Sequence, residues 1–329
     1  MIAPKPGAAA QPVRPGNEMR ILALSGGGYL GLFTAIVLAE LESQAGEPLA
    51  RCFDLIAGTS VGGILAIGLA YEVPMSRMVD LFMNHGRDVF SSRALPTGAV
   101  SRMLDMSRSV LGPKYTGDSL RAELATALGT QTLGEALHDF VVPAVNVTRS
   151  LTKVFKTPHG PSSMGDQSVL AVDVAMATCA APAYFPAVRI GDALYADGGM
   201  FAVAPDQVAL HEAEHFLGVD AQRVRMLSIG TATAGYRPVG GTDSGDGAVA
   251  WLRDGRLLLT LVSVQQQHVQ AMMEDRLRDR YLRIDAPWPQ DAGLGIDVAT
   301  RDASQRLAGL ARQAVAGADR ERLDTFLAR

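Results

Sequence analysis

The chain has 329 residues, of which 48% are hydrophobic and 19% charged, so it can form one sizeable core and is neither disordered, collagen-like nor a coiled coil. Its 30 basic and 34 acidic residues give a net charge of −4, so no broad basic surface for a nucleic acid polymer is expected. Glycine is abundant, at 34 residues, and the most informative glycines follow predicted strands.

The N-terminal segment 1–17 carries prolines at positions 4, 6, 12 and 15 and no apolar run. We predict a disordered Pro-rich arm there, not a signal peptide, followed by a single domain over 18–329. The longest uncharged apolar run, 55–71, is interrupted by glycines and indicates a buried strand, turn and helix rather than a membrane span. We therefore expect a cytoplasmic protein.

The apolar pattern predicts strands over 19–25, 53–57, 140–148 and 225–230, with a short extended piece beginning at 154–155. It predicts helices over 31–43, 61–71, 116–128, 172–179, 257–282 and 303–327. Buried strands alternating with helices are typical of an α/β protein with a mostly parallel sheet. Segment 74–115, with scattered methionines and prolines, indicates short helices and loops that could form a lid.

The two cysteines, Cys52 and Cys179, lie in apolar surroundings and are predicted to be buried free thiols. No Cys-x-x-Cys pair and no Cys/His spacing typical of a ligand set occurs, so no metal site is predicted.

A first glycine motif, Ser25-Gly-Gly-Gly-Tyr-Leu-Gly31, stands between a predicted strand and a predicted helix. Glycines 26, 28 and 31 fit the G-x-G-x-x-G pattern of dinucleotide-binding folds. The same geometry turns backbone N–H groups at a helix N-terminus toward any anion. On this motif alone, a cofactor pyrophosphate and a reaction oxyanion remain equal alternatives.

A second motif, Gly58-Thr-Ser-Val-Gly62, also joins a strand to a helix and predicts a nucleophile elbow with Ser60 at its apex. Gly58 and Gly62 would leave room for the strained turn. In a dinucleotide fold, an acidic residue for the ribose should end this second strand. Here Asp54 stands at its start and Gly58 at its end, which favours a serine nucleophile.

A serine nucleophile needs a base, and none of the six histidines stands in a glycine-rich turn. His211 and His215, four apart on a predicted helix among glutamates, are interpreted as a solvated helix face. Asp197 ends an apolar stretch and precedes Gly198-Gly199. It is either an ordinary Asp-Gly turn or a carboxylate projected into a site, and both interpretations stay open on these residues alone.

Four blocks in this order, Gly26-Gly-Gly-Tyr-Leu-Gly31, Gly58-Thr-Ser-Val-Gly-Gly63, 177–186 (ATCAAPAYFP) and Asp197-Gly-Gly199, resemble the patatin-like phospholipase family. The resemblance implies a three-layer α/β fold with a mostly parallel central sheet, helices on both faces and a nucleophile elbow. It implies hydrolysis of acyl ester bonds of membrane phospholipids through a Ser–Asp dyad and an acyl-enzyme, without histidine or a bound cofactor. The residues it implicates are Ser60 as nucleophile, Asp197 as base, and the N–H groups of Gly26, Gly27 and Gly28 as oxyanion hole.

Shorter strings at 28–35, 226–231 and 279–285 are similar to bacterial patatin-like effectors that cyclic dinucleotides activate in anti-phage signalling. This narrower resemblance implies a cyclic dinucleotide activator and action at the inner face of the membrane. Whether the chain forms a homo-oligomer stays open.

Near the predicted end of the 257–282 helix, arginines 276, 278, 280 and 283 alternate with acidic residues. The pattern indicates either a salt-bridged helix end or a phosphate-binding cluster for the activator. In the second case Arg276 and Arg280 are the expected contacts.

The chain departs from the family at Leu30, where an arginine or lysine is usual. We expect weaker activity or a substitute cation. Five apolar residues of the predicted lid either enter a lipid interface or pack against the core: Met103, Leu104, Met106, Val110 and Leu111. The rival functions are a nucleotide-binding Rossmann-like oxidoreductase, a non-catalytic lipid- or nucleotide-binding module, and a protease or acyltransferase on the same scaffold.

Overall fold

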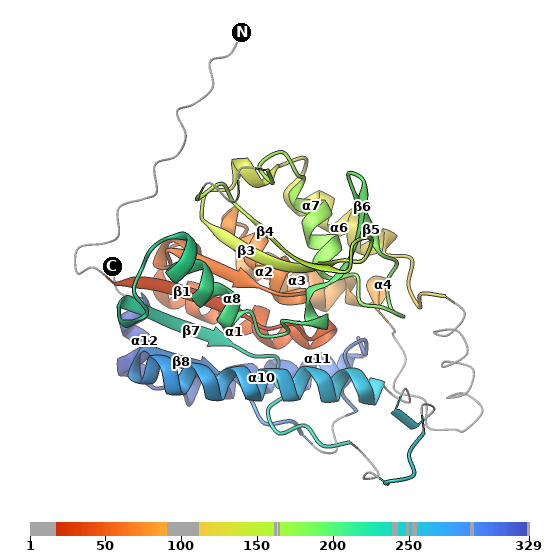
Figure 1. The fold of residues 1–329 in the computed structure, drawn as a ribbon. Helices are drawn as coiled ribbons and strands as arrows, with labels where there is room; N and C mark the ends of the chain where they lie inside the picture. Colours follow the sequence, from red (N-terminus) through yellow and green to blue (C-terminus); the bar gives the residue numbers. More distant parts are fainter. Residues whose placement is uncertain are drawn as a thin grey trace.

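A computed structural model describes residues 18–90, 112–160, 163, 165–238, 243–247, 250–251, 255–289 and 293–327 (Figure 1). The predicted arm over 1–17 and the five apolar lid residues lie outside the described residues.

One eight-stranded sheet forms the centre of the molecule, in the order β5-β6-β3-β2-β1-β7-β8, with β4 paired to β3. The pairs β1–β2, β1–β7, β2–β3 and β7–β8 are parallel, and β4, β5 and β6 join antiparallel. The strands are β1 Met19–Leu24, β2 Leu55–Gly58, β3 Phe140–Asn146, β4 Leu151–Lys156, β5 Val188–Ile190, β6 Ala193–Asp197, β7 Val224–Ile229 and β8 Tyr281–Ile284.

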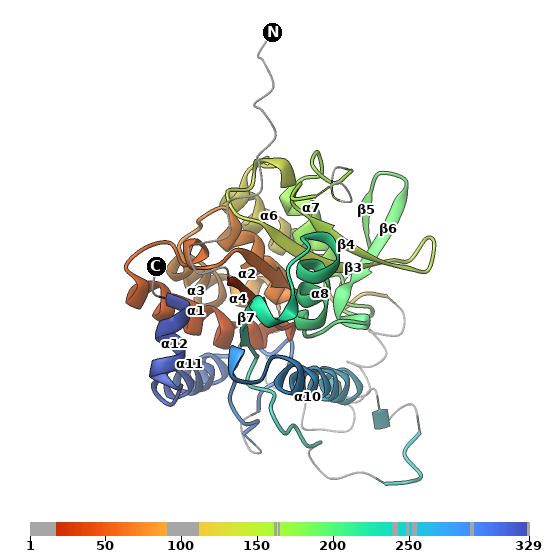
Figure 2. The ribbon, with the colours of Figure 1, turned by 60° about the vertical axis from the view of Figure 1, so that its left-hand side comes forward.

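Helices cover both faces of the sheet, because its central strands are apolar on both sides. Along β1, Leu22 and Leu24 enter the larger core, whereas Ile21 and Ala23 enter a smaller core on the other face. The larger core holds α1 Gly31–Ala45, α2 Val61–Ala70, α3 Met75–Asp80, α4 Gly86–Val89, α6 Asp118–Leu128, α7 Ala171–Thr178, α11 Arg301–Ala316 and α12 Arg320–Leu327. The smaller core lies under α8 Asp206–His211 and α10 Arg256–Leu277, which lie side by side (Figure 2).

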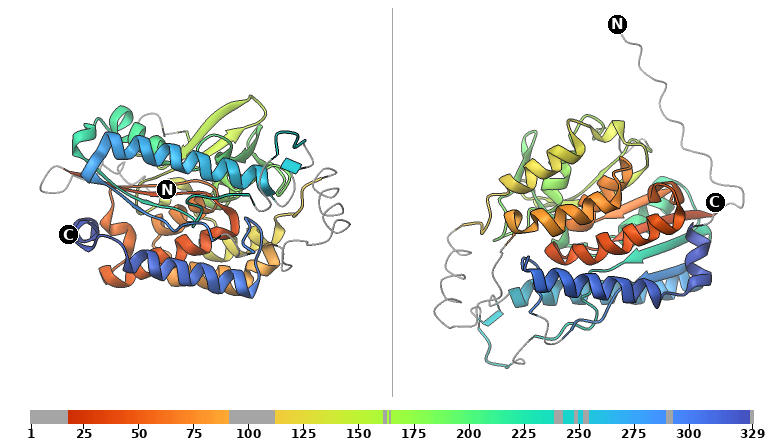
Figure 3. Two further views of the ribbon diagram at one scale, coloured as in Figure 1. Left: turned by 90° about the horizontal axis from the view of Figure 1, so that it is seen from below. Right: turned by 180° about the vertical axis from the view of Figure 1, so that it is seen from behind.

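Figure 3 shows α10 and α11 on opposite sides of the sheet. The predicted α/β class, the mostly parallel sheet and the three layers are therefore confirmed.

Two predicted helices are wrong in extent. The helix expected over 257–282 ends at Leu277, because Arg278 takes a left-handed φ of 54°. The chain then forms β8, whose Tyr281 and Leu282 are buried beside β7. The helix expected over 303–327 is two helices, interrupted after Ala316, and Asp319 accepts the Arg322 N–H at the start of the second.

The described first part of the predicted lid packs onto the body of the protein. Met75, Met78 and Phe82 are buried in the larger core. Cys52 and Cys179 are both buried and form no disulfide, as predicted. Within the described part of the chain, no helix combines the length and the apolar character that a membrane crossing requires.

Candidate active site

Ser60 stands at a sharp turn between β2 and α2. Its φ of 55° and ψ of −126° place a non-glycine residue in a strained conformation, which costs about 1–3 kcal/mol and persists only where the surroundings impose it. Thr178 imposes it here. The Ser60 N–H donates to Thr178 Oγ1 at 2.9 Å, and that hydroxyl donates to the Pro143 carbonyl at 2.7 Å.

Glycine is required at the two positions that flank Ser60, because other backbone atoms approach these positions closely. A Cβ atom on Gly62 would overlap the carbonyl oxygen of Leu24, and one on Gly58 would overlap that of Gly62. The turn therefore has the predicted form of a nucleophile elbow, with β1, β2 and α2 in direct contact around it.

Ser60 and Asp197 meet because two strands run toward each other. Strand β4 occupies one edge of β3, so β2 and β6 both pair with its other edge, β2 parallel and β6 antiparallel. Their carboxyl ends consequently face each other. The Ser60 hydroxyl donates to Asp197 Oδ2 at 2.8 Å, and Asp197 Oδ1 accepts the Gly199 N–H at 2.7 Å.

The surroundings of Asp197 adjust its basicity. Its side chain is only 6% exposed, and this burial raises the pKa of the carboxyl from 3.8 to about 6, against the opposing effect of the Gly199 and Ser60 hydrogen bonds. A carboxylate with this pKa is a better proton acceptor near neutral pH than an exposed aspartate. Among the described residues, no histidine bonds to Ser60 or Asp197.

The first glycine loop lies against the elbow. A Cβ atom on Gly26 would be 3.2 Å from Ser60 Cβ. The Gly26 N–H donates to the Val203 carbonyl at 2.8 Å, so it is not available as an oxyanion donor, contrary to the expectation. The N–H groups of Gly27 and Gly28 have no acceptor within the described residues, which leaves them as the candidate donors.

Leu30 is fully buried in the larger core. The position where the family usually has a cation is therefore apolar in this protein, and any electrostatic support for the loop must come from another element.

Two arginines of the predicted cluster, the expected contacts of the activator, lie far from Ser60, whereas Arg283 of the same cluster lies in β8. Arg276 and Arg280 precede β8 and stand at the amino ends of the parallel strands, whereas Ser60 follows the carboxyl end of β2. Arg276 forms an ion pair with Glu214 at 2.6 Å, and Arg280 donates to the carbonyls of Ala221 and Val224.

The remaining candidate residues from the sequence have contacts that indicate a structural role. His211 and His215 are exposed, as expected of a solvated helix face, and their rings stack at 5.1 Å. No group of three or more potential metal ligands occurs in the portion of the chain that the structure describes.

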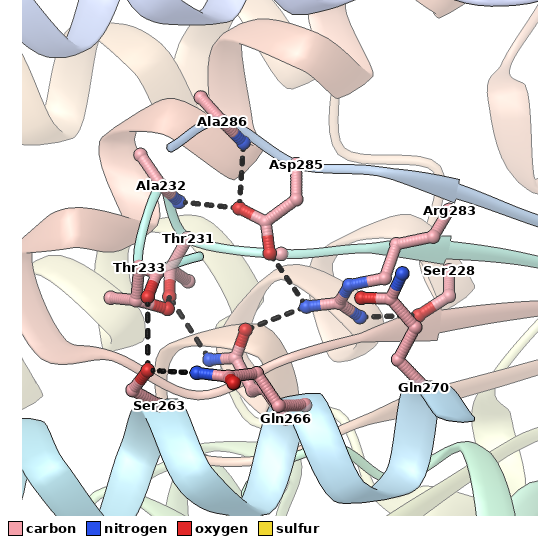
Figure 4. A network of polar contacts seen from close by, with 12 residues as sticks. Ser228, Thr231, Ala232, Thr233, Ser263, Gln266, Gln270, Arg283, Asp285 and Ala286 are labelled. Carbon is pink, nitrogen blue, oxygen red and sulfur yellow. Dashed lines mark hydrogen bonds and ion pairs between the residues drawn. The ribbon is translucent and has the colours of Figure 1, made fainter. Parts of the chain in front are cut away.

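Sequence reasoning did not assign two sets of residues around the site. The Thr178 hydroxyl holds the elbow, and its only signal was membership of the 177–186 block. Behind the glycine loop, Arg283, Gln266 and Thr231 form a buried polar network (Figure 4). Thr231 ends the string 226–231 and Arg283 lies in the string 279–285, both quoted for the narrower resemblance, but no motif includes Gln266.

Comparisons with known proteins place the chain among proteins of one family. The profile of the family described as patatin-like phospholipase matches residues 22–210. A cGAMP-activated phospholipase of Pseudomonas aeruginosa is 40% identical over 296 residues, which cover 90% of this chain and 83% of that protein. Proteins of the same name from Vibrio cholerae and Escherichia coli are 32% and 29% identical, covering 90% of this chain and 90% and 88% of theirs.

Proposed function

Because this chain belongs to the patatin-like phospholipase family and is accordingly a hydrolase, we propose that it cleaves acyl esters of membrane phospholipids through a Ser60–Asp197 dyad. The single observation that carries this proposal is the 2.8 Å hydrogen bond from Ser60 Oγ to Asp197 Oδ2 at a strained, glycine-flanked elbow. Because the chain belongs to a hydrolase family, neither an oxidoreductase nor a non-catalytic binding module is favoured as its function.

In the first half of the reaction, Ser60 Oγ attacks the ester carbonyl carbon and its proton passes to Asp197 Oδ2. The Gly27 and Gly28 N–H groups donate to the oxyanion that forms, an interaction worth about 10²–10³ in rate for each donor. The ester C–O bond then breaks, and Asp197 returns the proton to the leaving lysolipid oxygen. The product is an acyl-enzyme on Ser60.

In the second half, a water molecule attacks the acyl-enzyme and gives a proton to Asp197. The Ser60 Oγ–acyl bond breaks, the fatty acid leaves, and the proton returns to Ser60 Oγ. A dry site supports both halves, because burial raises the pKa of Asp197 and strengthens the hydrogen bonds to the oxyanion.

The test combines substitution with covalent labelling. We expect Ser60→Ala to lose phospholipid hydrolysis and labelling by a fluorophosphonate, with an unchanged circular dichroism spectrum. The matched control is Ser43→Ala, at an exposed position of α1, which should keep both. Undiminished hydrolysis by Ser60→Ala would overturn the dyad. Transfer of the acyl group to an alcohol in place of water, or cleavage of a peptide, would assign the acyltransferase or protease alternative.

We also propose that an apolar face beside the dyad meets the inner face of the membrane. Met200 and Phe201 directly follow the Asp197 turn and are 54% and 37% exposed. Gln265 of α10 bonds to that turn through the Gly199 carbonyl and the Val203 N–H. The same half of α10 exposes further apolar side chains, at Leu257, Leu261 and Val264. Exposed apolar residues gathered on one side are typical of interfacial binding.

We further propose that a cyclic dinucleotide switches the enzyme on in anti-phage defence. Support comes from the relatives, which are named cGAMP-activated. The candidate phosphate contacts are Arg276 and Arg280, which would have to exchange their present protein partners for the ligand.

Hydrolysis measured with and without a panel of cyclic dinucleotides tests activation, and calorimetry with cGAMP tests the arginines. We expect weaker cGAMP binding by the Arg276→Ala/Arg280→Ala variant and unchanged binding by Arg312→Ala, an exposed position on α11. Equal cGAMP affinity in all three proteins would remove the two arginines from the site.

A further inference from the structure

A buried arginine, Arg283, belongs to the network of polar contacts in Figure 4, and Gln266 connects this network to the Gly26 carbonyl. The Arg283 side chain is 4% exposed. Its guanidinium donates to Ser228 Oγ at 2.8 Å, to Asp285 Oδ2 at 2.7 Å and to Gln266 Oε1 at 2.6 Å. Asp285 Oδ1 in turn accepts two backbone N–H groups, those of Ala232 and Ala286. The guanidinium is therefore held on β8 with three directed contacts.

Arg283 determines which way the Gln266 amide points. A guanidinium has only donors, so the Gln266 atom that faces it must be the oxygen. The amide nitrogen is thereby turned toward the glycine loop. It donates to the Gly26 carbonyl at 3.3 Å and to Thr231 Oγ1 at 3.2 Å, and that hydroxyl also donates to the Gly26 carbonyl at 3.4 Å.

The Gly26 carbonyl belongs to the same planar peptide unit as the Gly27 N–H. In a trans peptide the C=O and N–H point in opposite directions. Holding the Gly26 oxygen toward α10 therefore turns the Gly27 N–H away from α10, and Ser60 lies next to the same peptide, 3.2 Å from where a Cβ atom on Gly26 would stand. Thr231 adds a steric limit, because a Cβ atom on Gly27 would lie 2.7 Å from its hydroxyl.

We propose that Gln266 and Arg283 are positioning residues for the oxyanion hole, acting through the Gly26–Gly27 peptide. This inference rests on the function proposed above. Gln266 fixes the peptide, and Arg283 fixes Gln266. Together they supply the support that a cation at the position of Leu30 would otherwise give. Because Asp285 balances the charge of Arg283, the support is transmitted by hydrogen-bond direction and polarisation of the peptide, not by a free positive charge.

A contribution to protein stability does not by itself explain the buried Arg283–Asp285 pair and its hydrogen bonds. A buried ion pair has a desolvation cost that often equals or exceeds its attraction. Gly230 is also restricted, because a Cβ atom there would overlap the Asp285 carboxylate. The network therefore restricts which residues can stand in β7, β8 and α10. It ends at the glycine loop.

Two isosteric substitutions test the inference. Gln266→Glu keeps an acceptor for Arg283 but presents an oxygen to the Gly26 carbonyl. Gln266→Met removes both contacts while keeping a similar volume. The matched control is Gln267→Met on the same helix, whose amide donates to Ser263 Oγ. Each variant is assayed for kcat and KM on a soluble short-chain ester, for the rate of fluorophosphonate labelling of Ser60, and for melting temperature.

We expect both Gln266 variants to lose kcat by about ten- to a hundredfold, less than the effect of a direct oxyanion donor, with little change in KM. The rate of phosphonate labelling should fall in parallel, because the phosphonyl oxygen occupies the same hole. Gln267→Met should keep wild-type values. If Gln266→Met is unstable, Gln266→Glu, which retains the Arg283 partner, provides the measurement.

Wild-type kcat in the folded Gln266 variants, or a change confined to KM or to melting temperature, would overturn the inference. Failure of the proposed function gives a different result, since Ser60→Ala would then stay active and the wild-type protein would not be labelled.

Discussion

Ser60 and Asp197 are 137 positions apart, yet their side chains share a 2.8 Å hydrogen bond. They meet because β2 and β6 approach each other along one edge of β3. Strand β3 therefore positions both residues of the proposed dyad, and its Pro143 carbonyl also accepts the Thr178 hydroxyl that holds the elbow.

The backbone strain at Ser60 predicts that the conformation required for function lowers the stability of the folded protein. We expect Ser60→Gly to raise the free energy of unfolding by about 1 kcal/mol, because glycine adopts a positive φ without a steric penalty, and to lose all hydrolysis. Thermal denaturation and a lipid assay measure the two effects. A lower melting temperature for Ser60→Gly would contradict the assignment of strain to this residue.

The raised pKa of Asp197 predicts the pH dependence of activity. The base must be ionised, so kcat/KM should rise tenfold per pH unit below about pH 6 and be constant above it. The profile is measured on a soluble ester, so that vesicle binding does not contribute. A profile that stays flat down to pH 4.5 would exclude this carboxylate as the titrating base.

The same shift predicts a pH-dependent stability difference for Asp197→Asn. Folded Asp197 keeps its proton up to about pH 6, whereas an unfolded aspartate loses it near 3.9. Between these values the folded state binds more protons, so wild-type stability falls as pH rises. Asp197→Asn lacks this loss. We expect the variant to be more stable by about 1–3 kcal/mol above pH 6, with the difference vanishing toward pH 4 in denaturant titrations.

The close approach at the elbow predicts opposite effects for two glycine substitutions. Gly62→Ala should abolish activity and lower stability by several kcal/mol, since its Cβ would overlap the Leu24 carbonyl. Gly309→Ala, in α11 with open space around it, should raise stability by up to about 1 kcal/mol. Equal melting temperatures for the two variants would mean that a Cβ atom fits at Gly62, contrary to the structure.

The sequence predicted the sharp turn at Ser60 well, because a strand, a glycine-flanked serine and a helix constrain one another locally. The pairing of Ser60 with Asp197 depended on the family resemblance, since nothing within either motif shows that β2 and β6 share an edge of β3. Strand β8 was missed because its arginine-rich approach continues a helical pattern. Gln266 contacts the Gly26 carbonyl, 240 positions away. In the sequence it is one of several glutamines in the segment that forms α10.

The apolar face beside Asp197 predicts a separation between membrane binding and chemistry. Replacing Met200, Leu261 and Val264 by serine should reduce hydrolysis of phospholipid vesicles about tenfold or more, by removing exposed apolar area that would enter the bilayer. Hydrolysis of a soluble short-chain ester should stay within twofold. Vesicle co-sedimentation and both assays measure these effects.

Leu137→Ser and Leu151→Ser provide the control, because both residues are 58% exposed and lie elsewhere, Leu137 in the segment before β3 and Leu151 in β4. An equal loss of vesicle hydrolysis in the control variants would mean that the contact is not specific to the face beside Asp197.

The two residues of the proposed dyad are held by strands that differ in burial. Ser60 follows a fully buried strand between β1 and β3. Asp197 ends β6, whose outer neighbour β5 has three residues, none of them buried. A brief separation of the β5–β6 hairpin would move the carboxylate away while the serine turn stays folded. Amide hydrogens of 193–197 should therefore exchange with deuterium sooner than those of 55–58, and a ligand that slows this exchange would act by keeping the base in place.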